Sequence, residues 1–381
     1  MKKINKPDST DKIKLTANIL FSGVGCQERG FKDSGLFDLD VLNTSDINKD
    51  AVVSYAAVHR GLTNEMIENY SEYPSREEMV KYLKAINLGY EPEKNKSYDW
   101  EKLARRKSND IEKYWLACKL SNNLGDISKI EKLPYADLWT CSFPCTDISL
   151  AGKMKGLSPS DSTRSSLLWE NIRLLKTAKD DGTLPKYIMF ENVKNLVGKK
   201  FINDFNNLLS VLDELGFNSY WQVLNAKYCG VPQHRERVFV VSFRNDIDAV
   251  SFKFPEPFYE RTKIDTIIGG ELINPHEEGI SRTIKAQYAK TSQANFLRSG
   301  TFGATGVRLK NKSRKLTPSE CWTLMGFDKE DCYKASAVGV SSANLYKQAG
   351  NGIVTNCCEL IAEHLYKAQY NSAYICTDEF R

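Results

Sequence analysis

The chain has 381 residues, of which 41% are hydrophobic and 27% are charged, and its formal net charge is +5. This composition is that of a globular protein of about two domains, and it excludes a fibrous or disordered chain. No apolar run approaches the roughly 18 residues of a membrane-spanning helix. Polar residues interrupt the apolar stretch that precedes Gly23, so we expect a buried strand there, no secretory signal, and a cytoplasmic protein.

Ten cysteines and four histidines are scattered through the chain without the spacing of a zinc site. A chain of this length needs no disulfide framework, so we expect reduced and mostly buried cysteines. We also expect no bound metal.

Short apolar runs alternate with amphipathic stretches, which predicts an α/β fold with a mixed, mostly parallel, doubly wound sheet. Strands are predicted at residues 17–21, 39–43, 137–142, 187–191, 220–225 and 238–243. Helices are predicted at residues 49–59, 167–177 and 201–215, the last of them ended by Gly216.

Two regions interrupt this alternation. Residues 62–123 are polar and helix-compatible and lack a strand signal, so they look like an insertion. From residue 245 to about 313 glycine, serine, threonine and basic residues dominate, and helical character returns at 319–325 and 344–366. The predicted units are 1–245 with the insertion, a small domain at 246–318, and a C-terminal segment at 319–381 that returns to the first unit.

The first predicted strand leads into a loop that contains Gly23 and Gly25. Glycines at the carboxyl edge of a parallel sheet let the backbone approach a ligand closely. Asp46 ends the second strand, where a carboxylate can accept both hydroxyls of a ribose, and Gly125-Asp126-Ile127 supplies a third loop. Glu28 stands where a dinucleotide fingerprint has its third glycine, so a plain tight turn remains the alternative.

Cys145 follows the third predicted strand, at the edge where α/β enzymes carry reactive groups. A free cysteine is more often a small buried hydrophobic residue. However, Glu191 ends the next strand, and Arg235 and Arg237 open a later one with their side chains on one face. A thiol, a carboxylate and paired arginines at one edge indicate a site for an electron-poor heterocycle.

Eight motifs, taken together and in order, closely resemble those of the DNA cytosine-5 methyltransferase family of bacteria and phages. They are Phe21-x-Gly-x-Gly25, Asp46, Gly125-Asp126-Ile127, Pro144-Cys145, Glu191-Asn192-Val193, Gln233-x-Arg235-x-Arg237, Arg314-x-Leu316-Thr317 through Phe327, and Gln348-x-Gly350-Asn351. The resemblance covers roughly residues 15–60, 124–245 and 314–365. It implies a methyltransferase-type sheet that binds S-adenosylmethionine, with a small, irregular target-recognition domain.

The resemblance also implies a role for each matching position. The catalytic residues would be Cys145, Glu191, Arg235 and Arg237. The cofactor pocket would be lined by Phe21, Gly23, Gly25, Asp46, Ile47, Asp126, Ile127, Pro144, Asn351 and Gly352. The sequence departs from the family pattern at Ile19, Cys26, Thr146 and Gly352.

The implied chemistry needs these groups. A thiolate that adds to carbon 6 of cytosine makes carbon 5 nucleophilic enough to take a methyl group. Glu191 would be protonated and donate toward N3, and burial beside the base favours that form. The cytosine must first be flipped out of the base stack, and the loop 149–165 is a suitable lid.

Residues 281–319 contain nine basic residues and no acidic residue, so they carry +9 while the rest of the chain carries −4. A charge run is usually a solvated surface, but the family places its target-recognition region here, which favours DNA contact. The candidate DNA-binding residues are Arg164, Gln233, Arg282, Lys285, Arg298 and Arg308.

The expected partner is double-stranded DNA, and the enzyme would act as a monomer. It would be either the protective half of a restriction–modification system, with a separately acting endonuclease, or an orphan methyltransferase. The alternatives are the family's tRNA-methylating branch and a non-catalytic DNA-binding regulator on the same fold. The absence of an Asp/Asn-Pro-Pro-Tyr/Phe motif disfavours an amino-group methyltransferase, and the broken glycine pattern disfavours a nicotinamide oxidoreductase.

Overall fold

The computed structural model describes residues 12–92, 94–144, 167–247, 252–257, 264–296, 303–310 and 312–370. Its centre is a six-stranded sheet with the strand order β2-β1-β3-β4-β6-β5. The strands are β1 (Ile13–Leu20), β2 (Phe37–Ser45), β3 (Leu138–Cys141), β4 (Tyr187–Val193), β5 (Phe217–Asn225) and β6 (Glu236–Arg244). Neighbours from β2 to β4 pair in parallel, whereas β6 pairs antiparallel with both β4 and β5. The predicted mixed sheet is confirmed.

Burial along each strand reflects its place in this sheet. All residues of the central strand β3 are buried, as are the first six of β4, because helices cover both faces there. Side chains alternate between the faces, so Tyr187 and Met189 join one hydrophobic cluster while Ile188 and Phe190 join the other. The edge strand β5 keeps several exposed side chains.

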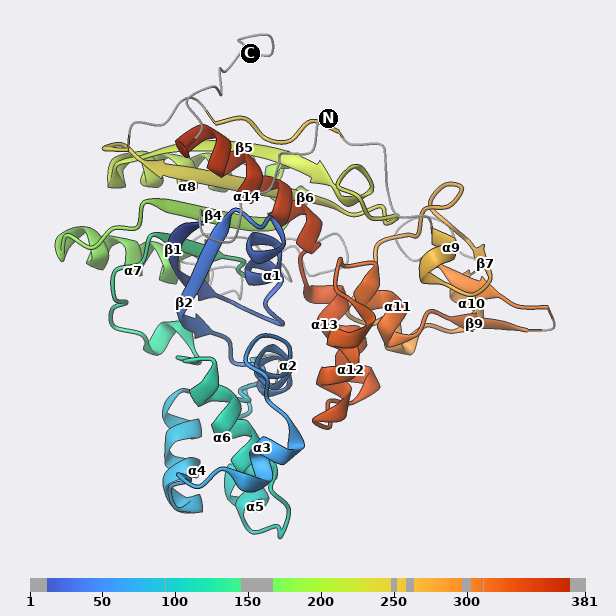
Figure 1. Ribbon diagram of the computed structural model, residues 1–381. Helices are drawn as coiled ribbons and strands as arrows, with labels where there is room; N and C mark the ends of the chain where they lie inside the picture. Colours follow the sequence, from blue (N-terminus) through green and yellow to red (C-terminus); the bar gives the residue numbers. More distant parts are fainter. Residues whose placement is uncertain are drawn as a thin grey trace.

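Two layers of helices sandwich the sheet (Figure 1). One face is covered by α1 (Cys26–Asp33), α2 (Lys49–His59) and α14 (Thr355–Tyr370), and the other by α7 (Leu168–Asp180) and α8 (Ile202–Leu215). The helix α1 packs closely on α14, since a side chain on Gly30 would meet the Cβ atom of Cys358 at 2.4 Å. Gly216 ends α8 in the left-handed conformation, as predicted.

The predicted insertion is helical. It contains α3 (Asn64–Asn69), α4 (Arg76–Ala85), α5 (Trp100–Ala104) and α6 (Asp110–Leu120). These helices lie beyond α2, at the bottom of the molecule in Figure 1. Trp100 is fully buried among them, and its indole nitrogen donates to the carbonyl of Leu88 at 3.0 Å.

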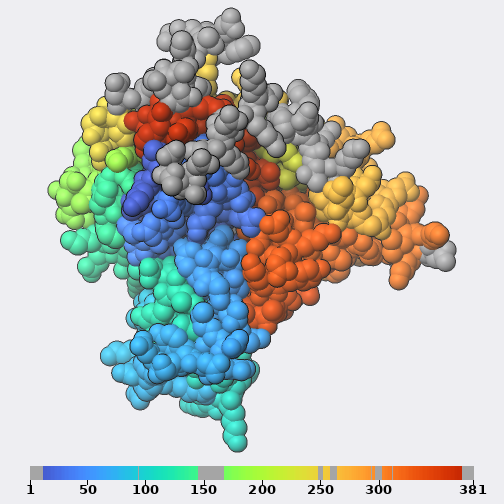
Figure 2. Space-filling view, viewed as in Figure 1, coloured from blue at the N-terminus to red at the C-terminus, as the bar shows by residue number. Residues whose placement is uncertain are grey.

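A second, three-stranded antiparallel sheet lies within residues 271–315. Its strands are β7 (Glu271–Ile273), β8 (Gly306–Arg308) and β9 (Ser313–Lys315), accompanied by α9 (Ile264–Ile267) and α10 (Gln293–Phe296). This unit projects from the side of the main body in the space-filling view (Figure 2). Arg314 joins it to the next helix through a bidentate ion pair with Glu320, both N–O distances being 2.8 Å.

The C-terminal segment contains α11 (Pro318–Thr323), α12 (Lys329–Ala337), α13 (Ser342–Asn351) and α14. The helical character predicted at 344–366 is confirmed, but it is divided between two helices, because the chain breaks between α13 and α14. Gly352 has φ −71° and ψ 171°, an extended conformation that ends α13. This break brings the end of α13 to the edge of the large sheet (Figure 1).

None of the helices in the described part of the chain is both long and apolar enough to cross a membrane. The eight cysteines among the described residues are buried and form no disulfide.

Candidate cofactor and catalytic site

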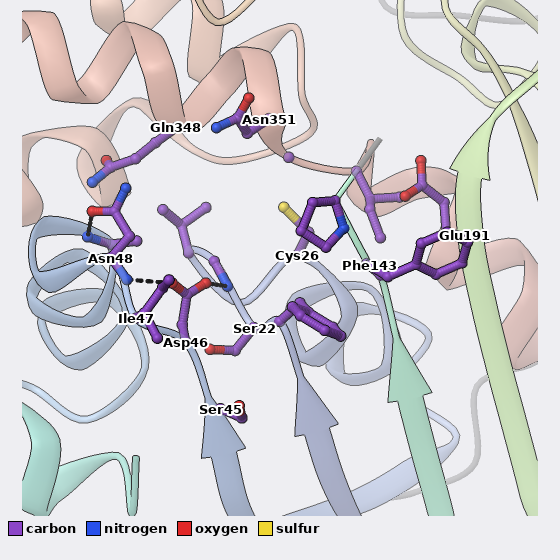
Figure 3. A pocket seen from close by; sticks show the side chains of 18 of the residues that line it. Ser22, Cys26, Ser45, Asp46, Ile47, Asn48, Phe143, Glu191, Gln348 and Asn351 are labelled. Carbon is purple, nitrogen blue, oxygen red and sulfur yellow. Dashed lines mark hydrogen bonds between the residues drawn. The ribbon is translucent and has the colours of Figure 1, made fainter. Parts of the chain in front are cut away.

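A cavity of about 320 Å³ lies at the carboxyl edge of the large sheet. Its walls include the segments that follow β1, β2 and β3, the end of β4, the start of β6, and the end of α13. Figure 3 shows Asp46 and Ile47 at one end of this pocket and Glu191 and Phe143 at the other. A volume of this size is within the usual range for cofactor sites.

The loop after β1 forms the floor of the cavity. Gly23 has φ +54°, and its amide donates to Oδ2 of Asp46 at 2.8 Å. The other oxygen of Asp46 accepts from the amide of Asn48 at 2.7 Å. Burial raises the pKa of the Asp46 carboxyl, although these two amides oppose the shift.

The space beside Gly23 shows whether a cofactor could fit in the cavity. A Cβ atom on this residue would meet nothing within 4 Å, and Gly23 lines the cavity. The missing side chain therefore leaves open space in which a ligand can approach the backbone.

Gly25, predicted to line the cofactor pocket, is not among the residues that line the cavity. It precedes α1 with φ +82°, and a Cβ atom there would meet Nε2 of His59 at 2.2 Å. That nitrogen lies 3.0 Å from the carbonyl oxygen of Val24, so His59 supports the loop from behind. Glu28 is also buried behind the loop, where it pairs with Arg60 at 2.7 Å and does not face the cavity.

The other predicted cofactor residues line the cavity as a group. They are Phe21, Asp46, Ile47, Asp126, Ile127, Pro144, Asn351 and Gly352. Asp126 caps a short 3-10 helix at Ile127–Lys129, and its Oδ1 atom accepts from the amide and the hydroxyl of Ser128 at 3.0 and 2.8 Å. The conformation of its carboxylate is thereby fixed by the fold.

Glu191 lies at the opposite end of the cavity, near the end of β4, and is 8% exposed. Because β6 runs antiparallel to β4, its first residues reach the same edge, with Arg237 paired opposite Val193. Nε of Arg237 is 3.1 Å from Oε1 of Glu191. Burial nevertheless raises the pKa of Glu191, and the nearby Arg237 and Arg235 only reduce this shift.

Arg235 and Gln233 occupy places that their predicted roles do not fit. Arg235 is 2% exposed and does not line the cavity, since its guanidinium donates to the carbonyls of Ile284, Gly350 and Gly352 at 2.9, 3.0 and 2.6 Å. Gln233, predicted to contact DNA, is fully buried. Its amide nitrogen donates to Leu324 and its oxygen accepts from Ile284. Both side chains join segments of the fold.

Two buried thiols, Cys26 at the start of α1 and Cys141 at the end of β3, have raised pKa values. Cys26 lines the cavity, and burial raises its pKa to about 12. Burial also raises the pKa of Cys141. The predicted nucleophile Cys145 lies outside the described residues, but the residue before it, Pro144, lines the cavity. Asn192 donates to the carbonyl of Phe143 at 3.0 Å and so fixes the start of that segment.

The remaining predicted DNA contacts differ in accessibility. Arg308 is exposed and makes a long 3.9 Å ion pair with Glu271. Arg282 donates to the carbonyl of Asn274 at 3.1 Å, and burial lowers the pKa of the half-buried Lys285. Arg164 and Arg298 lie outside the described residues.

The sequence interpretation missed several residues that line the cavity. Lys347 lies one helical turn before Asn351, a spacing that could have revealed it. Gln348 also lines the cavity, and it ties α13 to α2 through hydrogen bonds to Ser54 and to the carbonyl of Asp50, both 3.0 Å long. Pro92 comes from the insertion, where no local signal predicted a role in the site.

The fold and this site are typical of an α/β enzyme whose cavity, at the carboxyl edge of the sheet and beside a buried acid, is large enough for a nucleotide-like cofactor. Among the described residues no group of side chains could hold a metal ion.

Comparison with known proteins identifies the enzyme class. A sequence profile of C-5 cytosine-specific DNA methylases matches residues 75–295 and 261–367. Type II methyltransferase M2.ScrFI of Lactococcus lactis subsp. cremoris is 35% identical over 371 residues, which cover 92% of this chain and 98% of that protein. Type II methyltransferase M.HhaI of Haemophilus parahaemolyticus is 30% identical, over 63% of this chain and 80% of that protein.

The chain therefore belongs to the C-5 cytosine-specific DNA methylase family. It is a DNA cytosine-5 methyltransferase, and enzymes of this family take the methyl group from S-adenosylmethionine.

Solved structures confirm the fold. The Dnmt2 methyltransferase of S. pombe superimposes with a TM-score of 0.57 over 94% of this chain and all of that chain, at 15% sequence identity. The Entamoeba histolytica methyltransferase EhMeth gives a TM-score of 0.56 over 93% of this chain and 99% of that chain, at 12% identity.

Proposed function

We propose that the enzyme methylates cytosine within a specific short sequence of double-stranded DNA, through a covalent bond between Cys145 and carbon 6 of the base. The observation that carries this proposal is the cavity whose lining runs from Asp46, past Pro144, the residue before Cys145, to Glu191. The end at Asp46 suits a nucleoside, and the end at Glu191 offers a protonated acid to a base. A methyl donor and a cytosine can therefore lie next to each other in the cavity.

The residues that line this cavity would have different roles. Asp46 would accept the ribose hydroxyls, and Asp126 would accept a hydrogen bond from the adenine amino group. When bound, S-adenosylmethionine supplies an electrophilic methyl group. Phe21, Ile47 and Ile127 exclude water around it, since all three contribute apolar surface to the cavity.

Glu191 and Cys145 would act on the flipped base. The thiolate of Cys145 adds to carbon 6 while protonated Glu191 donates toward N3, and the electron pair moves to carbon 5, which takes the methyl group. Transfer of the carbon-5 proton to solvent then re-forms the double bond between carbons 5 and 6 and expels the thiolate, and N3 returns its proton to the Glu191 carboxylate. Arg237, 3.1 Å from Glu191, would hold the carboxyl in place.

The cellular setting is proposed by similarity. M2.ScrFI and M.HhaI are type II methyltransferases, whereas M.SssI of Spiroplasma monobiae, 28% identical over 92% of this chain and 97% of that protein, is an orphan methyltransferase. We propose a monomeric enzyme that acts as the modification half of a restriction–modification system, with a separate endonuclease as its counterpart.

Bisulfite sequencing of DNA from cells that express the chain tests this proposal. We expect 5-methylcytosine in one consistent short motif, and none when Cys145→Ala is expressed instead. Purified Cys145→Ala should still bind duplex DNA of that motif in a gel-shift assay, because the thiol is needed for chemistry and not for phosphate contacts.

Two results would contradict the proposal. Methylation by Cys145→Ala in a tritiated-donor assay would exclude the covalent route. Activity on tRNA but not on duplex DNA, measured side by side with the purified enzyme, would exclude the proposed substrate.

A further inference from the structure

The segment 86–92 of the helical insertion reaches the cavity beside the two loops that carry Ile47 and Asp126. The amide of Asp126 donates to the carbonyl of Ile86 at 2.9 Å, and the amide of Gly89 donates to the carbonyl of Ile47 at 2.7 Å. Pro92 lines the cavity itself. The insertion therefore forms part of the site.

This approach depends on close backbone packing. Gly125 has φ +71°, and a Cβ atom there would lie 2.0 Å from the carbonyl oxygen of Ile86. On the other side, the buried indole of Trp100 holds the carbonyl of Leu88. The segment is thus fixed between the cavity and the core of the insertion.

Asn87 makes the contact that bears on recognition. Its backbone has φ +55°, a left-handed conformation that asparagine tolerates better than most residues. Its side-chain amide donates to Oδ2 of Asp126 at 2.7 Å.

An ionised carboxylate offers about four acceptor positions. Ser128 fills two of them on Oδ1 of Asp126, and Asn87 fills one on Oδ2. Only one position is then left by the described residues, and it can accept a single hydrogen-bond donor.

We infer that Asn87 is a positioning residue that makes this site selective for a purine with an amino group at carbon 6. It fixes the Asp126 carboxylate so that its last acceptor position can take one hydrogen bond from the amino group of the purine. A purine with a carbonyl at carbon 6 presents an acceptor at that place and cannot make this hydrogen bond. The inference rests on the proposed role of Asp126 in binding adenine. It assigns to the insertion a share in cofactor selectivity.

The test compares S-adenosylhomocysteine with its deaminated analogue, S-inosylhomocysteine, by isothermal titration calorimetry on the full-length enzyme. Asn87→Gly removes the amide and keeps the left-handed backbone accessible. We expect it to bind S-adenosylhomocysteine about 3- to 10-fold more weakly, as for the loss of one hydrogen bond. The preference for the adenosyl over the inosyl compound should shrink as well.

Asn95→Gly is the matched control. Asn95 lies in the same insertion with φ +47°, its side chain accepts from the hydroxyl of Tyr90 at 2.7 Å, and it does not line the cavity. This variant should keep wild-type affinity and selectivity. Asn87→Asp is a second variant of nearly the same shape; it replaces the donor with an acceptor and should also lose selectivity.

The outcomes separate the inference from the proposed function. If wild-type enzyme does not bind S-adenosylhomocysteine, the proposed pocket is wrong. If wild type binds it and both Asn87 variants keep wild-type selectivity, the inference is overturned. If the Asn87 variants lose the same factor of affinity for both compounds and also have a lowered melting temperature, Asn87 has a purely structural role. That result would also overturn the inference.

Discussion

At the scale of single residues, the raised pKa of Glu191 follows from a competition between burial and charge. An acid beside a guanidinium usually has a lowered pKa. Here the carboxyl is 8% exposed, and the penalty for burying its charged form exceeds the attraction of Arg237 and Arg235. The neutral form therefore persists to a higher pH than in a free glutamic acid.

This shift predicts a pH profile. In the proposed mechanism protonated Glu191 is the donor, so methyl transfer should slow as the pH rises through its raised pKa. Cys145 must instead be a thiolate, which slows the reaction as the pH falls, and the two requirements give a bell-shaped curve. Glu191→Gln should lower the single-turnover rate by roughly 10²- to 10⁴-fold and remove the decline on the alkaline side.

Glu236→Gln is the control for this profile. Glu236 lies on the same strand as Arg237 but does not line the cavity, and it pairs with Lys194 at 2.9 Å. The rate of its variant should still decline on both the acidic and the alkaline side of the pH profile. An alkaline decline that survives in Glu191→Gln would show that another group donates the proton.

Sequence patterns located residues at this scale only where local rules decide their position. Gly23 and Asp46 were placed correctly because each directly follows a parallel strand, so both had to reach the same edge. The run from Gln233 through Arg235 to Arg237 was predicted to open a strand, and β6 begins within it, at Glu236. The sequence pattern could not show that Ile284 contacts both Gln233 and Arg235, or that the end of α13 contacts Arg235. These contacts join segments far apart in the chain.

At the scale of elements, the contact between α1 and α13 explains two departures from the family pattern. Cys26 begins α1, and Gly352 follows α13. A Cβ atom on Gly352 would lie 3.0 Å from Sγ of Cys26, closer than most such contacts. The larger residue at position 26 is therefore accommodated by a glycine at position 352.

This compensation predicts non-additive substitutions. Gly352→Ala should lower the free energy of unfolding by about 1 kcal/mol, because the added methyl group overpacks the contact. Cys26→Ala in the same chain removes the sulfur, and the double variant should regain most of that loss. Urea denaturation of the four proteins measures the coupling.

Gly269→Ala serves as the control for added volume. Gly269 has no positive φ, and a Cβ atom there would meet nothing within 4 Å, so its variant should stay within about 0.5 kcal/mol of wild type. Strict additivity of the Cys26 and Gly352 substitutions would contradict the compensation.

The helices of the insertion were predictable as a class, since residues 62–123 lacked a strand signal. Their contribution to the cavity was not, because segment 86–92 has no periodicity and reaches Asp126 only through tertiary packing. The same limit applied to the break between α13 and α14, which depends on the extended backbone at Gly352.

At the scale of the whole molecule, the basic charge of residues 281–319 is divided between structural and accessible side chains. Arg314 pairs with Glu320, and Lys315 donates to the carbonyl of Ala289 at 2.7 Å. By contrast Arg308, Lys310 and Lys312 are exposed around the turn between β8 and β9, on the domain that projects from the body (Figure 2). These three are the accessible charges of that hairpin.

The division predicts how DNA affinity responds to salt. Each phosphate contact contributes a slope of about −0.9 to the dependence of log affinity on log salt concentration. The double variant Arg308→Gln, Lys310→Gln should reduce that slope by up to about 2 in fluorescence anisotropy titrations with duplex DNA.

Lys14→Gln provides the control, because Lys14 is exposed near the start of β1, at the edge of the sheet opposite the cavity. Its slope should equal that of wild type. An unchanged slope for the hairpin variant would show that these side chains do not contact phosphates.

The buried guanidinium of Arg235 has a consequence for the order in which ligands bind. It donates hydrogen bonds to the carbonyls of Ile284, Gly350 and Gly352, and the last two residues line the cavity. A ligand that orders either side therefore orders part of the other, and thermodynamic linkage makes such an effect reciprocal. Cofactor and DNA are thus expected to act as mutual effectors, each raising the affinity for the other by the same factor.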